Sequence, residues 1–180
     1  MDKNIVFFDI ETKQLIPSNG DLSGLEIAIA GVKHGSNDFF FQENEVDNLL
    51  ASLQKADLIV GHNILRFDYP ILKKYTKPEL IESLKPKTFD MHFELDRLTG
   101  RWISLDDLAK RNVGMTKTVD SKLIPQMWQM GKRDEVKEYL KNDLNMTEKV
   151  YLHAKTQGKL KYDHKEYGKS LGERVISLKW

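Results

Sequence analysis

The chain has 180 residues, of which 40% are hydrophobic and 31% are charged, and its formal net charge is +1. This composition is typical of one globular domain and excludes a disordered chain. The absence of cysteine excludes disulfides, thiolate catalysis and cysteine-ligated zinc, and it is typical of a cytoplasmic protein. The sequence has no run of about 18 apolar residues, so no membrane span is predicted, and the N-terminus lacks the pattern of a signal peptide.

The first half of the chain contains the segments that favour strands. Residues 4–9 are apolar without alternation, which indicates a strand covered on both faces. The other predicted strands are residues 25–32, 39–41, 58–60 and 87–90. A helix between the third and fourth strands is predicted from the spacing of Val46, Leu49, Leu50 and Leu53.

The second half is predicted to be mostly helical. One helix begins near Asp68, with Pro70 in its first turn, and another begins after Ser104 as its N-cap. Residues 135–153 have an apolar stripe that predicts a long helix. Strands early and helices late predict an α/β layered domain. The end of the chain, from residue 174, is expected to be either an added edge strand or a packing arm.

Two acidic residues follow the first apolar strand. Asp9 and Glu11 are two positions apart, so on a strand both side chains leave the same face. Ligand sites of α/β proteins form where strands end, which favours a binding role. A pair of this kind is also common on solvated strand ends, and alone it is weak evidence.

A second acidic segment follows the strand at residues 58–60. Gly61 and Asn63 lead to Phe67 and Asp68, and Pro70 comes directly after. Asp68 alone reads as an ordinary helix N-cap. Its neighbours favour a shaped loop that presents an amide, an aromatic ring and a carboxylate to one cleft.

The third segment lies on the long helix. Tyr139 and Asp143 are four residues apart, so they share one helix face, although Tyr139 also reads as a core aromatic. If this helix covers the strand end, four carboxylates meet, and they need a cation to stay ionised together. Such oxygen ligands favour Mg²⁺ or Mn²⁺, ions that also hold phosphates.

Taken together, the three segments resemble the DEDD 3′-5′ exonucleases, in their tyrosine-bearing branch, and most of all the proofreading exonuclease domain of B-family DNA polymerases. The matching motifs are Phe8-Asp9-Ile10-Glu11, then Gly61, Asn63, Phe67, Asp68 and Pro70, and finally Tyr139 with Asp143. The resemblance implies a ribonuclease-H-like fold, with a mixed central sheet of about five strands flanked by helices. It covers residues 1–157 as the exonuclease domain, and residues 158–180 are expected to be an extension packed on or projecting from it.

The resemblance also implies a role for each matching position. Asp9, Glu11, Asp68 and Asp143 would bind two Mg²⁺ or Mn²⁺ ions at the scissile phosphate, and Tyr139 would hold the attacking water. Asn63, Phe67 and Thr12 would contact the terminal nucleotides. The implied partner is nucleic acid with a 3′ end, with single-stranded DNA as the favoured substrate although the sequence does not distinguish DNA from RNA. A polymerase, helicase or other replication or repair protein is a candidate companion.

Other residues have plainer interpretations. His62 is expected to be structural, and Asp90 to make structural hydrogen bonds at a strand end. The basic stretch of Lys73, Lys74, Lys77, Lys85 and Lys87 reads as a solvated face rather than a phosphate track. Trp102, Trp128 and Trp180 are expected to be packing residues rather than base platforms.

Two other functions are consistent with parts of the sequence. One is a nucleic-acid-binding module of the same fold that has lost turnover. The other is an aspartyl-phosphate phosphatase built on Asp9, but that chemistry normally needs an aspartate where Glu11 stands, and it leaves the segment from Gly61 to Pro70 unexplained.

Overall fold

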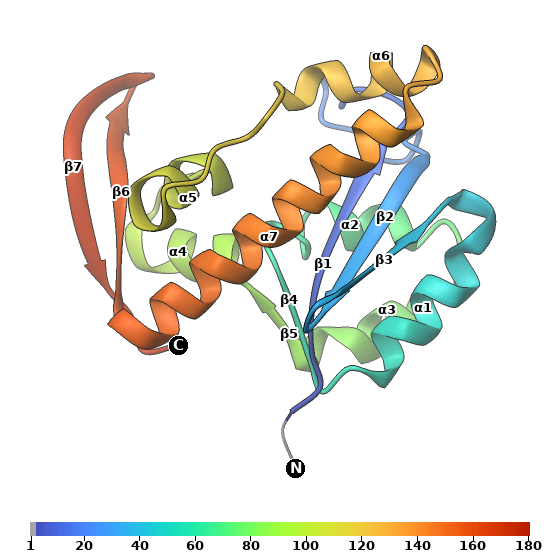
Figure 1. Cartoon of the computed structure of the whole chain (residues 1–180), viewed down its shortest axis with the longest axis horizontal. Helices are drawn as coiled ribbons and strands as arrows, with labels where there is room; N and C mark the ends of the chain where they lie inside the picture. Colours follow the sequence, from blue (N-terminus) through green and yellow to red (C-terminus); the bar gives the residue numbers. More distant parts are fainter. Residues whose placement is uncertain (1–2) are drawn as a thin grey trace.

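A five-stranded mixed sheet forms the centre of the molecule in the computed structural model, which describes residues 3–180 (Figure 1). Its strands are β1 (Ile5–Thr12), β2 (Ile27–His34), β3 (Asn37–Phe41), β4 (Leu58–Gly61) and β5 (Thr88–Asp90). Their order is β3-β2-β1-β4-β5; β1, β2 and β3 pair antiparallel, and β4 and β5 run parallel to β1. This confirms the predicted α/β class and all five predicted strands.

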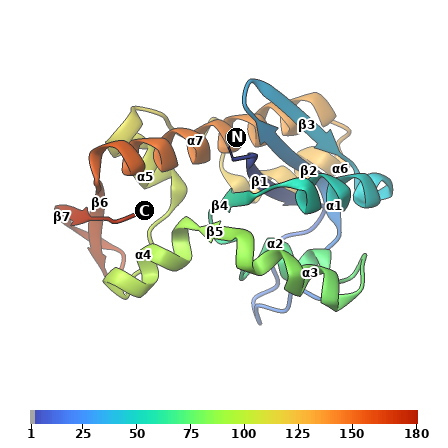
Figure 2. The same ribbon diagram turned by 90° about the horizontal axis from the view of Figure 1, so that it is seen from below.

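Helices cover both faces of the sheet (Figure 2). They are α1 (Val46–Lys55), α2 (Asp68–Leu72), α3 (Pro78–Leu84), α4 (Met91–Thr99), α5 (Leu105–Val113), α6 (Ile124–Gln129) and α7 (Arg133–Gln157). The first three pack on one face and α4, α5 and α7 on the other, each group around its own apolar core. Ser104 caps α5 as predicted, because its side chain accepts a hydrogen bond from the Asp107 N–H.

The alternation of β1 decides where its acids point. Val6, Phe8 and Ile10 belong to the core beneath α1, α2 and α3, whereas Phe7 belongs to the core beneath α7. Since alternate side chains share a face, Asp9 and Glu11 project with Phe7 toward α7.

Helix α7 approaches the sheet closely at the level of Asp9. Asp9 pairs with Gly31 on β2, and a Cβ atom added at Gly31 would lie 2.7 Å from Leu144 Cδ1 and 3.1 Å from Leu140 Cδ2. Both leucines flank Asp143 on α7. The missing side chain of Gly31 therefore lets the helix bring Asp143 over β1.

The end of the chain forms a separate hairpin of β6 (Lys159–Glu166) and β7 (Lys169–Ser177), which curves away from the sheet (Figure 1). The alternative of an edge strand added to the central sheet is therefore wrong, and the two strands of this hairpin were not predicted as a pair. Leu160, Tyr162 and Leu178 anchor the hairpin in the core beside α5 and α7.

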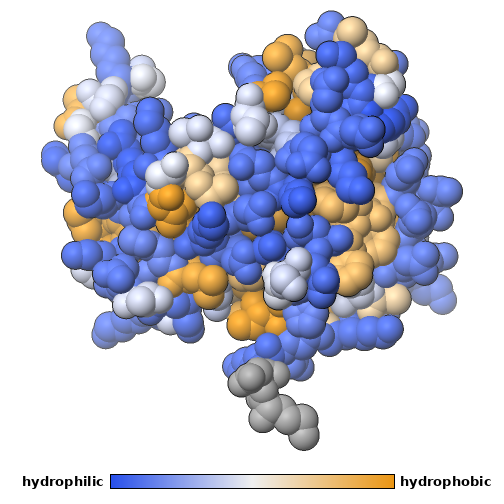
Figure 3. Space-filling model, viewed as in Figure 1, coloured by the Kyte–Doolittle hydropathy of each residue, from blue (hydrophilic) through white to orange (hydrophobic). Residues whose placement is uncertain are grey.

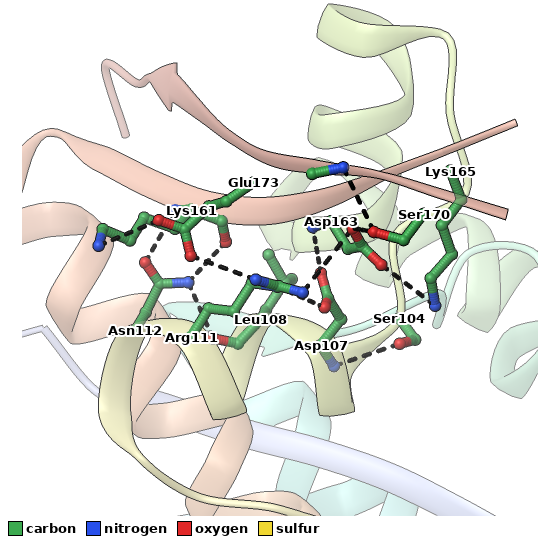
Figure 4. A network of polar contacts seen from close by, with 11 residues as sticks. Ser104, Asp107, Leu108, Arg111, Asn112, Lys161, Asp163, Lys165, Ser170 and Glu173 are labelled. Atoms are coloured by element: carbon green, nitrogen blue, oxygen red, sulfur yellow. Dashed lines mark hydrogen bonds and ion pairs between the residues drawn. The ribbon is translucent and has the colours of Figure 1, made fainter.

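Polar contacts also tie the hairpin to α5 (Figure 4). The Asp163 N–H donates to Asp107 Oδ2 at 2.7 Å, and the Asn112 side chain exchanges two hydrogen bonds of 2.8 Å with the backbone of Lys161. Arg111 on α5 reaches Glu173 on β7 at 3.2 Å. Within residues 3–180 no helix is long and apolar enough to cross a bilayer.

Candidate functional site

Three carboxylates from two elements converge above the end of β1. Asp9 and Glu11 come from this strand and Asp143 comes from α7, and one oxygen of each lies within 4.8 Å of the other two. The predicted meeting of the first and third acidic segments thus occurs, through the strand alternation and the close approach at Gly31 described above.

The fourth predicted acid lies beside this trio rather than inside it. Asp68 is the first residue of α2 and its side chain is only 1% exposed. The charge of Asp9 raises the pKa of Asp68, and the charge of Asp68 in turn contributes to raising the pKa of Glu11. Asp68 therefore shares the electrostatic field of the trio, on the side of Asp9.

Burial and mutual repulsion raise the pKa values of the carboxylates. Burial, followed by the charge of Asp143, raises the pKa of Asp9 to about 7. Burial also raises the pKa of Glu11 and Asp68 well above the ordinary range and raises that of Asp143, against the lowering effect of Lys117. A cation beside these acids would offset the burial and repulsion that raise their pKa values, and would favour their ionised forms.

The donor set fits a hard divalent cation. Asp68 Oδ1 and Asp143 Oδ1 are buried and have no hydrogen-bond partner among residues 3–180. A buried polar atom without a partner is costly and rare. An all-carboxylate set is the choice of Mg²⁺ or Mn²⁺ rather than of zinc, and a bound cation is the partner that such oxygens lack.

A lysine that the sequence analysis missed enters this acidic site. Lys117 lies in the segment between α5 and α6, and its Nζ donates to Asp143 Oδ2 at 2.7 Å and to the Tyr139 hydroxyl at 2.5 Å. The same ammonium lies 5.0 Å from the centre of the Tyr139 ring. Its pKa is raised because Asp143, Asp9 and Glu11 together outweigh the opposing effect of its burial.

The segment carrying Lys117 also borders open space beside the site. Residues 116–121 line a hollow of about 430 Å³ together with Asp106. The outline of the molecule is likewise hollowed between the β6–β7 hairpin and the end of the molecule formed by α6 (Figure 3). The hollow therefore lies beside Lys117, the partner of Asp143, while Asp9 and Glu11 are half-buried and Asp143 is buried.

Asp90 organises the loop that carries the second motif. Its Oδ1 accepts from the backbone N–H of Asn63 at 2.8 Å and of His92 at 2.9 Å, and its Oδ2 accepts from that of Leu65 at 2.9 Å. The loop holds Asn63 at a φ of 72°, a left-handed conformation that asparagine tolerates better than most residues. The structural role predicted for Asp90 is confirmed.

The remaining residues predicted to contact substrate are Phe67, Asn63 and Thr12. Phe67 is half-buried and precedes α2 directly, and the amide oxygen of Asn63 has no partner among residues 3–180. The Thr12 hydroxyl is buried and donates to the Gln14 carbonyl at 2.7 Å. His62 makes the kind of contact expected of a structural histidine, because its Nε2 lies 3.0 Å from the Ile103 carbonyl oxygen.

Two surface expectations have different outcomes. Most of the basic stretch is engaged, since Lys73 and Lys85 pair with Glu82, while Lys87 donates to backbone carbonyls. The Lys73 and Lys85 side chains are 41% and 40% exposed, in agreement with the predicted solvated face. The packing role expected for Trp102 is wrong, because this side chain is 65% exposed.

The free energy of unfolding of the protein should depend on the protonation of these acids and on a bound cation. The pKa of Asp9 is about 7 in the folded chain against 3.8 as its ordinary value, so the folded state binds more protons between these pH values. The free energy of unfolding therefore falls as pH rises through this window, by ~2 kcal/mol after allowance for partial exposure. In EDTA, Tm should fall from pH 5 to pH 8.

Calorimetry with and without Mn²⁺ at pH 8 checks this expectation. An ion at a hundred times its Kd should raise Tm by roughly 5–10 °C, and Asp9→Asn should lose most of that rise. A Tm that is flat with pH and indifferent to Mn²⁺ would contradict the assignment of a cation site.

The sequence model of a family described as the RNase_H superfamily matches residues 6–157. Among solved structures, the chain is similar to a family B DNA polymerase from the hyperthermophilic archaeon Pyrobaculum calidifontis, with a TM-score of 0.62 and 14% identity. That similarity covers 87% of this chain and 24% of the polymerase, so the likeness is one of fold over about a quarter of the larger protein. No curated protein sequence matches the chain.

Proposed function

We propose, from the premise that the chain belongs to the RNase_H superfamily, that it is a metal-dependent 3′-5′ exonuclease. It would hydrolyse phosphodiester bonds at the 3′ end of nucleic acid, preferably single-stranded DNA, and release nucleoside monophosphates. The observation that carries this proposal is the convergence of Asp9, Glu11 and Asp143 within 4.8 Å, with buried oxygens that lack partners among residues 3–180.

The acids supply the binding site for cations and, through them, for the scissile phosphate. Asp9, Glu11 and Asp143 would hold one ion, and Asp68, which lies on the side of Asp9, would help to hold a second. Two divalent ions, when bound, stabilise the attacking and leaving oxygens of an in-line displacement. The raised pKa values support this role, because carboxylates that resist ionisation alone are those that a cation compensates.

Tyr139 would position the attacking water as a neutral phenol. Burial first, then the charges of Asp143 and Glu11, raise the pKa of the Tyr139 hydroxyl far above its ordinary value. The phenol therefore keeps its proton and cannot serve as a general base. The ammonium of Lys117 donates to the same hydroxyl and fixes the phenol oxygen, and the hydrogen bond between Tyr139 and Asp143 adds to the raised pKa of the phenol.

The loop held by Asp90 would bind the end of the substrate. The buried amide oxygen of Asn63, which lacks a partner among residues 3–180, and the ring of Phe67 would offer a hydrogen bond and a stacking surface for the terminal nucleotides, and Thr12 is the third proposed contact. We propose that residues 1–157 act as the exonuclease domain and that the hairpin extends it. A polymerase or another replication or repair protein is the proposed companion, in line with the structural likeness.

The proposal is tested with a 5′-labelled single strand incubated with Mg²⁺ or Mn²⁺, the products being resolved by length. We expect a ladder of products that shorten by one nucleotide at a time from the 3′ end. A strand ending in a 3′-phosphate and an RNA strand of equal sequence measure the selectivity for the 3′ terminus and for the sugar. Cleavage at internal positions, or none with either ion, would overturn the proposal.

Tyr139→Phe should lower activity only in part. The variant keeps the ring and loses one hydrogen bond, which is worth ~1.5 kcal/mol and about tenfold in kcat. Single-turnover rates on the labelled strand measure this loss, and Tyr151→Phe, a buried tyrosine of the same helix outside the carboxylate site, is the matched control. Equal kcat values for Tyr139→Phe and the wild type would remove Tyr139 from the mechanism.

One observation favours a second candidate, the binding module without turnover. The ammonium of Lys117 already pairs with Asp143, so the charge of one metal ligand is compensated by the chain itself. If this pair excludes cations, labelled strands would stay intact in both metals while gel shifts persist. Titrating Mn²⁺ into the wild type and into Lys117→Met separates the two functions. Cation binding by Lys117→Met alone would show that the Lys117–Asp143 pair excludes cations from the wild type.

A further inference from the structure

Trp102 is exposed in a way that its surroundings do not explain. It lies between α4 and α5, and 65% of its surface is open, whereas Trp128 is buried in an apolar core and Trp180 packs against Phe89. A large aromatic side chain is a costly group to leave in water, and exposed aromatic residues are typical of binding surfaces. The ring therefore has the features of a contact site.

The ring is supported from below rather than loose. The His92 ring lies 3.9 Å from the Trp102 ring, centre to centre, at an interplanar angle of 67°. His92 is 2% exposed and is itself 5.5 Å from the His62 ring. An edge-on contact with a buried histidine fixes the position of the indole without covering its surface.

This support connects Trp102 to the loop of the second motif. Asp90 Oδ1 accepts from the N–H groups of both His92 and Asn63, and His62 contacts the carbonyl of Ile103, the residue after Trp102. The two ring distances together place Trp102 within about 9.4 Å of His62. Bases stacked at ~3.4 Å cover that span in about three nucleotides.

We propose that Trp102 is a stacking platform for a base of a single strand a few nucleotides before its 3′ end. The proposal rests on the proposed function, which puts the terminal nucleotides at Asn63 and Phe67. Aromatic rings hold bases of any sequence by stacking, which suits a substrate that must advance one nucleotide at a time. Phe93, which follows His92 in the chain, is also exposed, at 41%, and the Arg66 guanidinium lies 5.9 Å from its ring centre.

The charges around the ring favour stacking over phosphate binding. Arg66 pairs with Asp96, Arg97 with Glu94, and Arg101 with Glu166 of the hairpin. Each nearby cation is therefore matched by an acid, and the surface has little net charge to attract a backbone. Binding at Trp102 should depend weakly on salt, because it releases few counterions.

The test compares Trp102→Ala and Trp102→Phe with the wild type on a dT12 strand and on the dinucleotide pdTpdT. Trp102→Ala should raise KM for dT12 about tenfold with kcat unchanged, and should leave pdTpdT unaffected because a dinucleotide is too short to reach the ring. Trp102→Phe should restore most of the affinity. Phe39→Ala, an exposed aromatic on β3 at the opposite edge of the sheet, is the matched control and should change nothing.

Binding of labelled dT12 in EDTA separates this inference from the proposed function. Loss of dT12 affinity in Trp102→Ala, even with a wild type that releases no nucleotides, supports the platform while the exonuclease proposal fails. A wild type that digests dT12 with the same KM as Trp102→Ala overturns the platform and leaves the exonuclease intact. A wild type that does not bind dT12 also overturns the platform.

Discussion

Asp143→Ala is expected to lower the rate of nucleotide release by roughly a thousandfold, which corresponds to ~4 kcal/mol of lost transition-state stabilisation. The substitution removes one of three carboxylates that share a space of 4.8 Å, and it also removes the partner of Lys117. The remaining acids would have to hold the cation with an ammonium beside them. Both effects act on cation binding, so the loss should exceed that of any single hydrogen bond.

Two measurements separate loss of the cation from loss of the fold. In EDTA at pH 8, Asp143→Asn should unfold at a Tm equal to or above that of the wild type, because a carboxyl with a raised pKa destabilises the folded state. The rise of Tm with Mn²⁺ should disappear. Glu138→Ala removes an acid from the exposed side of the same helix and is the control. Full activity in Asp143→Ala would mean that chemistry takes place elsewhere.

The sequence predicted those parts of the site that local pattern determines. Asp9 and Glu11 stand on an uninterrupted apolar strand, whose alternation sends both to one face. Tyr139 and Asp143 stand on a long helix whose apolar stripe must face the sheet. In both cases one periodicity fixes both the element and the direction of its side chains. The spatial meeting then follows from packing the helix on that face.

Lys117 could not be found in the same way. It lies in an irregular segment, without periodicity, and nothing local distinguishes it among the 28 lysines and arginines of the chain. Its position depends on how α5 and α6 are joined across the site, which is a tertiary property. The exposure of Trp102 is missed for a related reason, since a tryptophan between two helices is usually buried by them.

The hairpin was obscure because its strands carry little hydrophobic signal. In β6 only Leu160 and Tyr162 are buried, and β7 is exposed along nearly all its length. The strands are held by contacts with α5 that only the tertiary structure provides, such as the bond between Asp107 and Asp163. A prediction based on hydrophobic patterns therefore misses the strands of a hairpin that is attached largely by polar contacts.

Gly61→Ala is expected to disrupt both the fold and the site, because Gly61 lies between them. A Cβ atom at this position would lie 2.9 Å from the Phe8 carbonyl oxygen and would overlap the Ile64 side chain. The carbonyl belongs to β1 and cannot rotate away, so β1 and β4 must separate. Overpacking of this kind costs about 1–3 kcal/mol, which should lower Tm by roughly 3–8 °C.

The activity should fall further than the stability, because of what the two strands carry. Asp9 follows Phe8 on β1, and the loop after Gly61 leads to Asp68, so a wedge between the strands moves these acids apart. A displacement of about 1 Å costs on the order of a hundredfold in rate. Gly24→Ala, where an added Cβ meets nothing within 4 Å and φ is ordinary, should leave both properties unchanged. Wild-type activity in Gly61→Ala at a temperature where it is fully folded would show that the spacing of Asp9 and Asp68 does not limit catalysis.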